Sequence, residues 1–99
     1  MANDKTDSEL VEMVKSGGGR AFTAMGCVIN NKRDYPGDVD DVFRLLSDTE
    51  PISFACSPSH LAQAYLFHKG LIRRSDVDEC WQTDNLLKCY EAESPERHG

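Results

Sequence analysis

One central segment of the chain spaces its hydrophobic residues as a helix does. Ser57-Pro58 is typical of a helix start, because serine caps free backbone amides and proline needs no amide partner in the first turn. Gly70 is typical of a helix end. Between them, residues at i, i+3, i+4 and i+7 form one stripe: Leu61, Ala64, Tyr65 and His68. The pattern predicts a helix over 58–69 with one face toward a core.

Alternating apolar positions predict strands on both sides of this helix. Residues 42–46 and 51–56 are interpreted as a β-hairpin around the polar turn 47–50, with Ile52, Phe54 and Cys56 on one face. Residues 80–83 and 86–90 are interpreted as a second pair, joined through Asp84-Asn85. A helix over 39–46 is the alternative to the first strand, since its apolar residues also fit a period of 3.6.

The N-terminal third has clear local signals. Thr6 and Glu9 have the spacing of a capping box, and a stripe of apolar residues then runs to Gly17-Gly18-Gly19, which ends the helix and predicts a flexible linker. The alternating residues after the glycines predict a strand: Met25, Cys27 and Ile29. Residues 30–38 are rich in turn formers and predict a loop.

These elements predict an α+β fold: a small antiparallel sheet in the order β-β-α-β-β, with the 58–69 helix packed on one face. Residues 1–37 are expected to form a partly ordered helical and strand arm, 38–92 the domain, and 93–99 a disordered tail. A domain of roughly 55 residues buries only a small core, so a partner or the arm completes it. The predicted core consists of Phe43, Leu45, Ile52, Phe54, Leu61, Tyr65, Leu71, Ile72, Trp81 and Leu87.

Composition narrows the class of partner. The 99 residues carry a formal net charge of -6, which argues against nucleic acid and anionic membrane as principal partners, because both require a basic face. No apolar run approaches the roughly 18 residues that a membrane span needs. The first residues lack the basic start and apolar centre of a secretory signal. We therefore expect a cytoplasmic protein.

The four cysteines form no C-x-x-C pair. Reduced, buried thiols are the default interpretation for a cytoplasmic chain. A zinc site is the alternative, because Cys-x3-His places two ligands near the predicted helix start, although structural zinc sites usually have tighter C-x2-C pairs. Its candidate ligands are Cys56, His60, Cys80 and Cys89.

Residues 50–72 also resemble a known family. The run EPISFACSP followed by LAQAYLFHKGLI is similar to the N-terminal region of the FdhD family, the formate dehydrogenase accessory sulfurtransferases. That family has an E-P-x-x-[apolar]-x-x-[ST]-P strand followed by a helix resembling L-A-x-G-[FY]-L-x-x-E-G-I-I. The matching positions are Glu50, Pro51, Ser57, Pro58, Leu61, Ala62, Tyr65, Leu66, Gly70, Leu71 and Ile72.

The resemblance implies an accessory role in molybdenum cofactor and formate dehydrogenase maturation, with formate dehydrogenase or the sulfur-transfer machinery as partner. Ala64 and Lys69 replace the family's glycine and glutamate, and the family's sulfur-carrying C-x-x-C loop has no counterpart. We therefore expect a non-catalytic interaction module without a cofactor. The enzymatic alternative is a small sulfur carrier that uses Cys56, where a helix N-terminus would favour the thiolate, or the pair Cys80 and Cys89.

Overall fold

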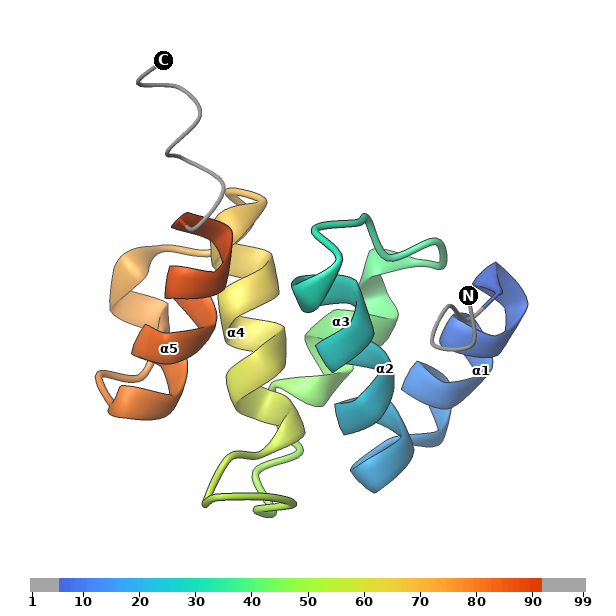
Figure 1. Cartoon of the computed structure of the whole chain (residues 1–99), viewed down its shortest axis with the longest axis horizontal. Helices are drawn as coiled ribbons and strands as arrows, with labels where there is room; N and C mark the ends of the chain where they lie inside the picture. Colours follow the sequence, from blue (N-terminus) through green and yellow to red (C-terminus); the bar gives the residue numbers. More distant parts are fainter. Residues whose placement is uncertain (1–5, 92–99) are drawn as a thin grey trace.

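The computed structural model describes residues 6–91, and within them the chain is helical (Figure 1). The helices in chain order are α1 (Asp7–Ser16), α2 (Gly18–Asn30), α3 (Val39–Leu45), α4 (Pro58–His68), the short 3-10 helix η1 (Arg74–Asp76) and α5 (Trp81–Glu91). The described residues contain no strand, only an isolated bridge between Ser53 and Cys56. The predicted α+β fold with its antiparallel sheet is therefore wrong. The tail predicted over 93–99 lies outside the described residues.

The start of α1 is the capping box that its sequence predicts. The Thr6 amide donates to Glu9 Oε1 at 2.9 Å, and the Glu9 amide donates to Thr6 Oγ1 at 3.2 Å. Gly17, at φ +73°, then ends α1, and α2 begins at the next residue. The glycine triplet is thus a sharp corner between two helices and not the flexible linker that we expected.

The strand predicted around residue 25 is part of α2. Its buried residues recur every three or four positions: Ala21, Ala24, Met25, Val28 and Ile29. The alternation of Met25, Cys27 and Ile29 misled the prediction, because Met25 and Ile29, four residues apart, share a face in a strand and in a helix alike, whereas Cys27 is only partly buried. Extending the window to Ala21 favours the helix.

The strands predicted over 42–46 and 80–90 are helices as well. α3 adopts the helical alternative, with the Asp38 side chain accepting the Asp40 amide at 3.0 Å and Val42 and Leu45 buried. α5 replaces the second strand pair, including its proposed turn at Asp84-Asn85. Its inward positions, Thr83 and Tyr90, are seven residues apart, which is two helical turns.

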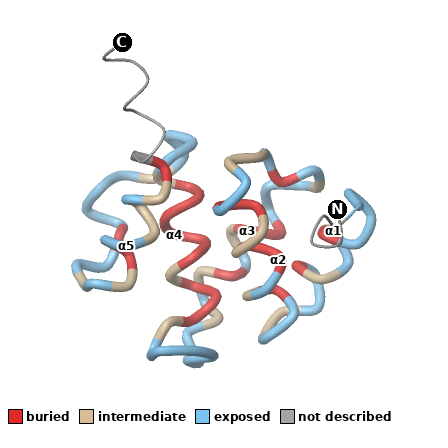
Figure 2. Tube along the Cα trace, viewed as in Figure 1, coloured by how far each residue is buried: buried red, intermediate tan, exposed pale blue. Residues whose placement is uncertain are grey.

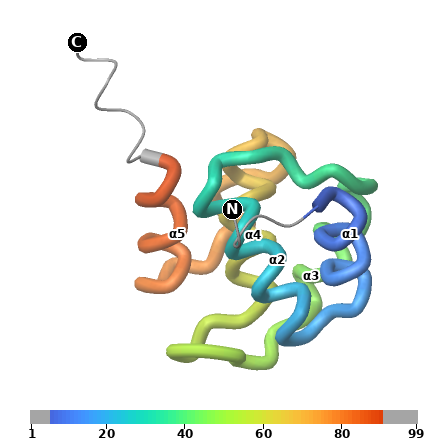
Figure 3. Tube along the Cα trace, turned by 45° about the vertical axis from the view of Figure 1, so that its right-hand side comes forward, coloured from blue at the N-terminus to red at the C-terminus, as the bar shows by residue number. Residues whose placement is uncertain are grey.

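α4 is the central element of the molecule. It lies between α2 and α3 on one side and α5 on the other (Figure 1), and in the turned view of Figure 3 it again separates α5 from α1. Eight of its eleven residues are buried, so the tube in Figure 2 is red along most of this helix. Its predicted start at Ser57-Pro58 is confirmed, as is its end before Gly70, which has φ +78°. The helix is surrounded by other helices and does not cover a sheet.

The predicted core is only partly correct. Leu45, Leu61 and Tyr65 are buried, and three others are partly buried: Phe43, Ile72 and Leu87. Four residues predicted to be buried are exposed instead: Ile52, Phe54, Leu71 and Trp81. Much of the actual core comes from α1 and α2, including Leu10, Met25 and Ile29. No helix of the described stretch is both long enough and apolar enough to cross a membrane.

Candidate functional site

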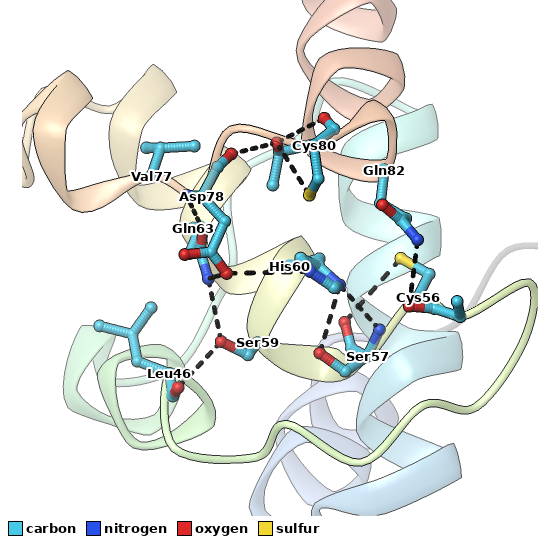
Figure 4. Close-up of polar contacts among 12 residues, drawn as sticks. Leu46, Cys56, Ser57, Ser59, His60, Gln63, Val77, Asp78, Cys80 and Gln82 are labelled. Atoms are coloured by element: carbon cyan, nitrogen blue, oxygen red, sulfur yellow. Dashed lines mark hydrogen bonds and ion pairs between the residues drawn. The ribbon is translucent and has the colours of Figure 1, made fainter.

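Three of the four candidate ligands from the sequence lie around the N-terminal end of α4. Cys56 precedes the N-cap residue Ser57, His60 lies in the first turn, and Cys80 approaches from the segment before α5 (Figure 4). Cys89 lies elsewhere, with its Sγ 4.0 Å from the Asn30 side chain at the end of α2. Because α5 is a helix, Cys80 and Cys89 do not face each other across a hairpin. All four cysteines are free thiols.

Ser57 and His60 form a capping box in which histidine occupies the position usually held by glutamate. The Ser57 amide donates to His60 Nδ1 at 3.1 Å, and the Ser57 hydroxyl lies 3.3 Å from the same nitrogen. A nitrogen that accepts the amide proton carries none of its own, so the neutral ring has its proton on Nε2. That nitrogen faces the Asp78 carboxylate at 3.9 Å.

A chain of hydrogen bonds ties the segment before α5 to α4 (Figure 4). The Asp78 amide donates to Gln63 Oε1 at 2.7 Å, and Gln63 Nε2 donates to Ser59 Oγ at 3.1 Å. The Ser59 hydroxyl in turn donates to the Leu46 carbonyl at 2.8 Å, just after α3. Two other parts of the chain, the segment before α5 and the residue that follows α3, are therefore fixed to one turn of α4.

Ser57, His60 and Asp78 are the residue types of a hydrolytic triad, but their geometry is that of a helix start. Ser57 is only 2% exposed, so no substrate reaches its hydroxyl. His60 Nδ1 already accepts a backbone amide, and the 3.9 Å between His60 and Asp78 exceeds hydrogen-bond length. Sequence reasoning missed Asp78 and Gln63. The Ser57-x-x-His60 spacing was the one available signal, and it indicates capping.

The Cys56 thiol is a poor sulfur acceptor in this setting. Burial raises the pKa of Cys56, and the neighbouring Cys80 raises it further, which outweighs the opposite effect of a hydrogen bond to the Ser57 backbone. Sulfur transfer needs the thiolate, so a raised pKa disfavours it. The helix N-terminus does not produce the lowered pKa on which the sulfur-carrier alternative depends.

The described residues also give little support to the zinc alternative. Among residues 6–91, no group of three or more histidine, cysteine, aspartate or glutamate side chains is placed to hold a metal ion. Cys89, the fourth candidate ligand, packs near the end of α2 and does not join the other three.

The same end of the molecule carries three large apolar side chains that face solvent. We call them the exposed tip: Ile52 (42% exposed), Phe54 (84%) and Trp81 (58%). Gln82 connects the two segments that carry them, because its Nε2 donates to the Ala55 carbonyl at 3.3 Å and lies 3.5 Å from the Phe54 carbonyl. The loop before α4 and the first turn of α5 are thereby held together.

The backbone of the tip is strained. Phe54 and Ala55 have φ of +51° and +60°, a left-handed conformation that costs a residue with a side chain on the order of 1 kcal/mol. The loop is closed across its base, where the Ile52 amide and the Cys56 amide donate to the Cys56 and Ser53 carbonyls, both at 2.8 Å. This closure and the Gln82 contact hold Phe54 outward at the apex of a tight turn.

The sequence segments that carry the tip are acidic. Neither residues 45–68 nor residues 75–87 contain lysine or arginine, whereas both carry carboxylates. Glu50 and Glu79 are exposed, each within four residues of a tip side chain, and neither has an ion-pair partner among residues 6–91. Asp78 and Asp84 are also exposed, but Asp78 lies 3.9 Å from His60 Nε2 and Asp84 lies 3.8 Å from the Arg74 guanidinium. The exposed tip is therefore apolar with an acidic surround.

Comparison of the chain with protein-family models, with curated proteins and with solved structures found no match. The resemblance to the FdhD family is thus neither supported nor opposed by these comparisons and stays a prediction.

Proposed function

We propose that this chain is a non-catalytic interaction protein that binds a partner protein through the exposed tip. The observation that carries the proposal is Phe54, which is 84% exposed on a left-handed backbone that glycine adopts readily and that is strained for a bulky residue. Folding alone gains little from such an arrangement. Strain retained at a loop apex is typical of sites where the surrounding structure fixes a side chain for another purpose.

The composition of the exposed tip fits a protein contact. Aromatic residues dominate the binding energy of protein interfaces, and tryptophan is the most enriched of them. Trp81 and Phe54 come from two segments that Gln82 holds together, so little conformational entropy is lost when a partner binds. Full burial of the Phe54 side chain would contribute about 2 kcal/mol.

The polar groups beside the tip favour binding over chemistry. Ser57 and His60 are committed to the start of α4, and the pKa of Cys56 is raised. These groups stabilise the platform on which the exposed tip stands. Ser57 is buried and the Cys56 thiol is held in its neutral form, so neither is both accessible and activated as a nucleophile.

The resemblance to the FdhD family proposes formate dehydrogenase or a sulfur-transfer protein as the partner. Nothing in the helical fold favours this partner class over others. A pull-down with the full chain that returns neither protein would remove the class from consideration while leaving the exposed tip as the binding surface.

Photo-crosslinking from the tip tests the proposal directly. We expect a chain with p-benzoylphenylalanine at position 54 to crosslink to a discrete protein, and a chain with the same group at the exposed Glu12 of α1 to give no such product. The crosslinked protein is then purified, and its affinity is measured for the wild-type chain and two variants. Phe54→Ser should weaken binding roughly 30-fold or more, as loss of an interface hot spot does.

Leu71→Ser is the matched control, because Leu71 is 50% exposed but follows the opposite end of α4. Its affinity should equal that of the wild type. Equal binding by Phe54→Ser and the wild-type chain would reject the proposal, as would a crosslink that forms only from position 12.

A further inference from the structure

We propose that the exposed tip recognises a cationic amphipathic helix of its partner: apolar side chains on one face, flanked by lysine or arginine. This inference rests on the proposed function and adds the chemistry of the bound segment. It is carried by the juxtaposition of three exposed apolar side chains with two exposed glutamates, Glu50 and Glu79, that have no ion-pair partner within residues 6–91.

The charges come from both segments that form the tip. Glu50 precedes Ile52 and Phe54 in the loop, and Glu79 precedes Trp81 at the start of α5. Neither glutamate has an ion-pair partner within residues 6–91, so both are available to a partner's cations. Apolar contact in the centre with charge pairs at the rim is the usual anatomy of a protein interface.

The backbone of the tip favours a helix over an extended peptide. An extended peptide binds by adding a strand to an open sheet edge. The tip has only the isolated Ser53–Cys56 bridge, and its loop amides at Ile52 and Cys56 are already paired. An incoming segment must therefore satisfy its own backbone hydrogen bonds, as a helix does, and contact the tip through side chains at i, i+3, i+4 and i+7.

The same charges disfavour two other occupants of an exposed apolar surface. A symmetric dimer would bring Glu50 and Glu79 of one copy toward those of the other, which is repulsive. An anionic lipid surface carries the same sign as the acidic surround, so insertion of Phe54 and Trp81 into it is opposed.

Trp81 is the only tryptophan in the chain, so its fluorescence reports on the tip without a label. The probe is a synthetic peptide of about 14 residues, with leucine at one helical face and lysine elsewhere; a leucine–glutamate peptide of the same pattern is the control. We expect a saturable blue shift of Trp81 emission with the lysine peptide and none with the glutamate peptide. Phe54→Ser should weaken binding of the lysine peptide roughly tenfold or more.

The rim is tested with the double variant Glu50→Gln/Glu79→Gln. Exposed charge pairs contribute modestly, so the double variant should weaken the lysine peptide roughly three- to tenfold, and raised salt should do the same to the wild type. Glu12→Gln/Asp40→Asn removes the same net charge away from the tip and should leave affinity unchanged. Circular dichroism of each variant checks that the helices are intact.

The outcomes separate this inference from the proposed function. Binding that depends on Phe54 but not on salt or the two glutamates overturns the cationic helix and leaves the interaction surface in place. Equal binding of both peptides, or none of the lysine peptide, also overturns it. A blue shift on anionic vesicles, or one that grows with protein concentration alone, replaces the helix with a membrane or a second copy.

Discussion

The loop over 47–56 and the first two turns of α4 adjoin in the chain but have opposite relations to water. In α4, polar side chains that look like chemistry are buried and hydrogen-bonded to one another, such as Ser59 and Gln63. In the loop, apolar side chains that look like core face solvent, such as Ile52 and Phe54. Residue type alone would place the loop in the core and the polar side chains of α4 at the surface. Which region is buried therefore follows from packing and not from composition.

The largest expected effect on stability comes from a substitution in the buried helix α4. Leu66 is fully buried in the last turn of α4, and Leu66→Ala should lower the free energy of unfolding by about 3 kcal/mol through lost burial and the cavity left behind. Phe54→Ala removes a larger side chain from the exposed tip and should change stability by less than about 0.5 kcal/mol. Urea unfolding followed by circular dichroism measures both. Comparable losses in the two variants would mean that the tip is part of the core.

Local signals were the part of the fold that the sequence predicted well. Thr6 with Glu9, Ser57-Pro58 and Gly70 mark helix ends because their hydrogen bonds or backbone angles are settled within a few residues. These signals do not depend on the rest of the molecule. Each of them was confirmed.

The sheet prediction failed where short apolar runs fit two periods at once. Residues 42–46 and 86–90 satisfy both a strand and a helix, and propensity does not decide between them. The neighbouring elements decide. α4 packs against α2, α3 and α5, and a helix buries an apolar face against another helix without leaving an unpaired sheet edge. That arrangement is set by the whole chain.

The candidate site was predictable in its location but not in its use. Sequence reasoning placed Cys56 and His60 at the start of a helix, which is where they lie. It missed Asp78 and Gln63, which are 15 residues apart and meet only after the chain between them folds back. It also assigned Ile52 and Trp81 to the core, because exposure is a property of the packed molecule.

An intermediate effect is expected from the buried hydrogen-bond chain. Gln63→Ala leaves the Asp78 amide without its 2.7 Å acceptor and the Ser59 hydroxyl without its donor, which should cost about 1–2 kcal/mol. Amide hydrogen exchange should show faster exchange at Asp78 in particular. Gln82→Ala is the control, because Gln82 contacts carbonyls of the exposed loop and should change stability little while loosening the tip. Equal losses in both variants would remove the distinction between a rigid platform and its tip.

The smallest expected effect tests the backbone strain at the tip. Here an alanine-to-glycine substitution should raise the free energy of unfolding, whereas it usually lowers it. Ala55 has φ +60°, where glycine is favoured, so Ala55→Gly should raise the free energy of unfolding by about 0.5–1 kcal/mol. The same substitution in the right-handed turns of α4, at the buried Ala64, should lower it by about 1 kcal/mol or more. Thermal unfolding of the two variants compares them directly.

A stabilised Ala55→Gly chain that binds its partner more weakly would show what the strain is for. Glycine widens the angles open to the loop, so Phe54 is held outward less firmly and its ordering on binding costs more. The strained alanine then trades stability for a preorganised contact. If Ala55→Gly destabilises the chain as Ala64→Gly does, the left-handed conformation at the tip is not maintained in solution, and backbone strain does not preorganise Phe54 for binding.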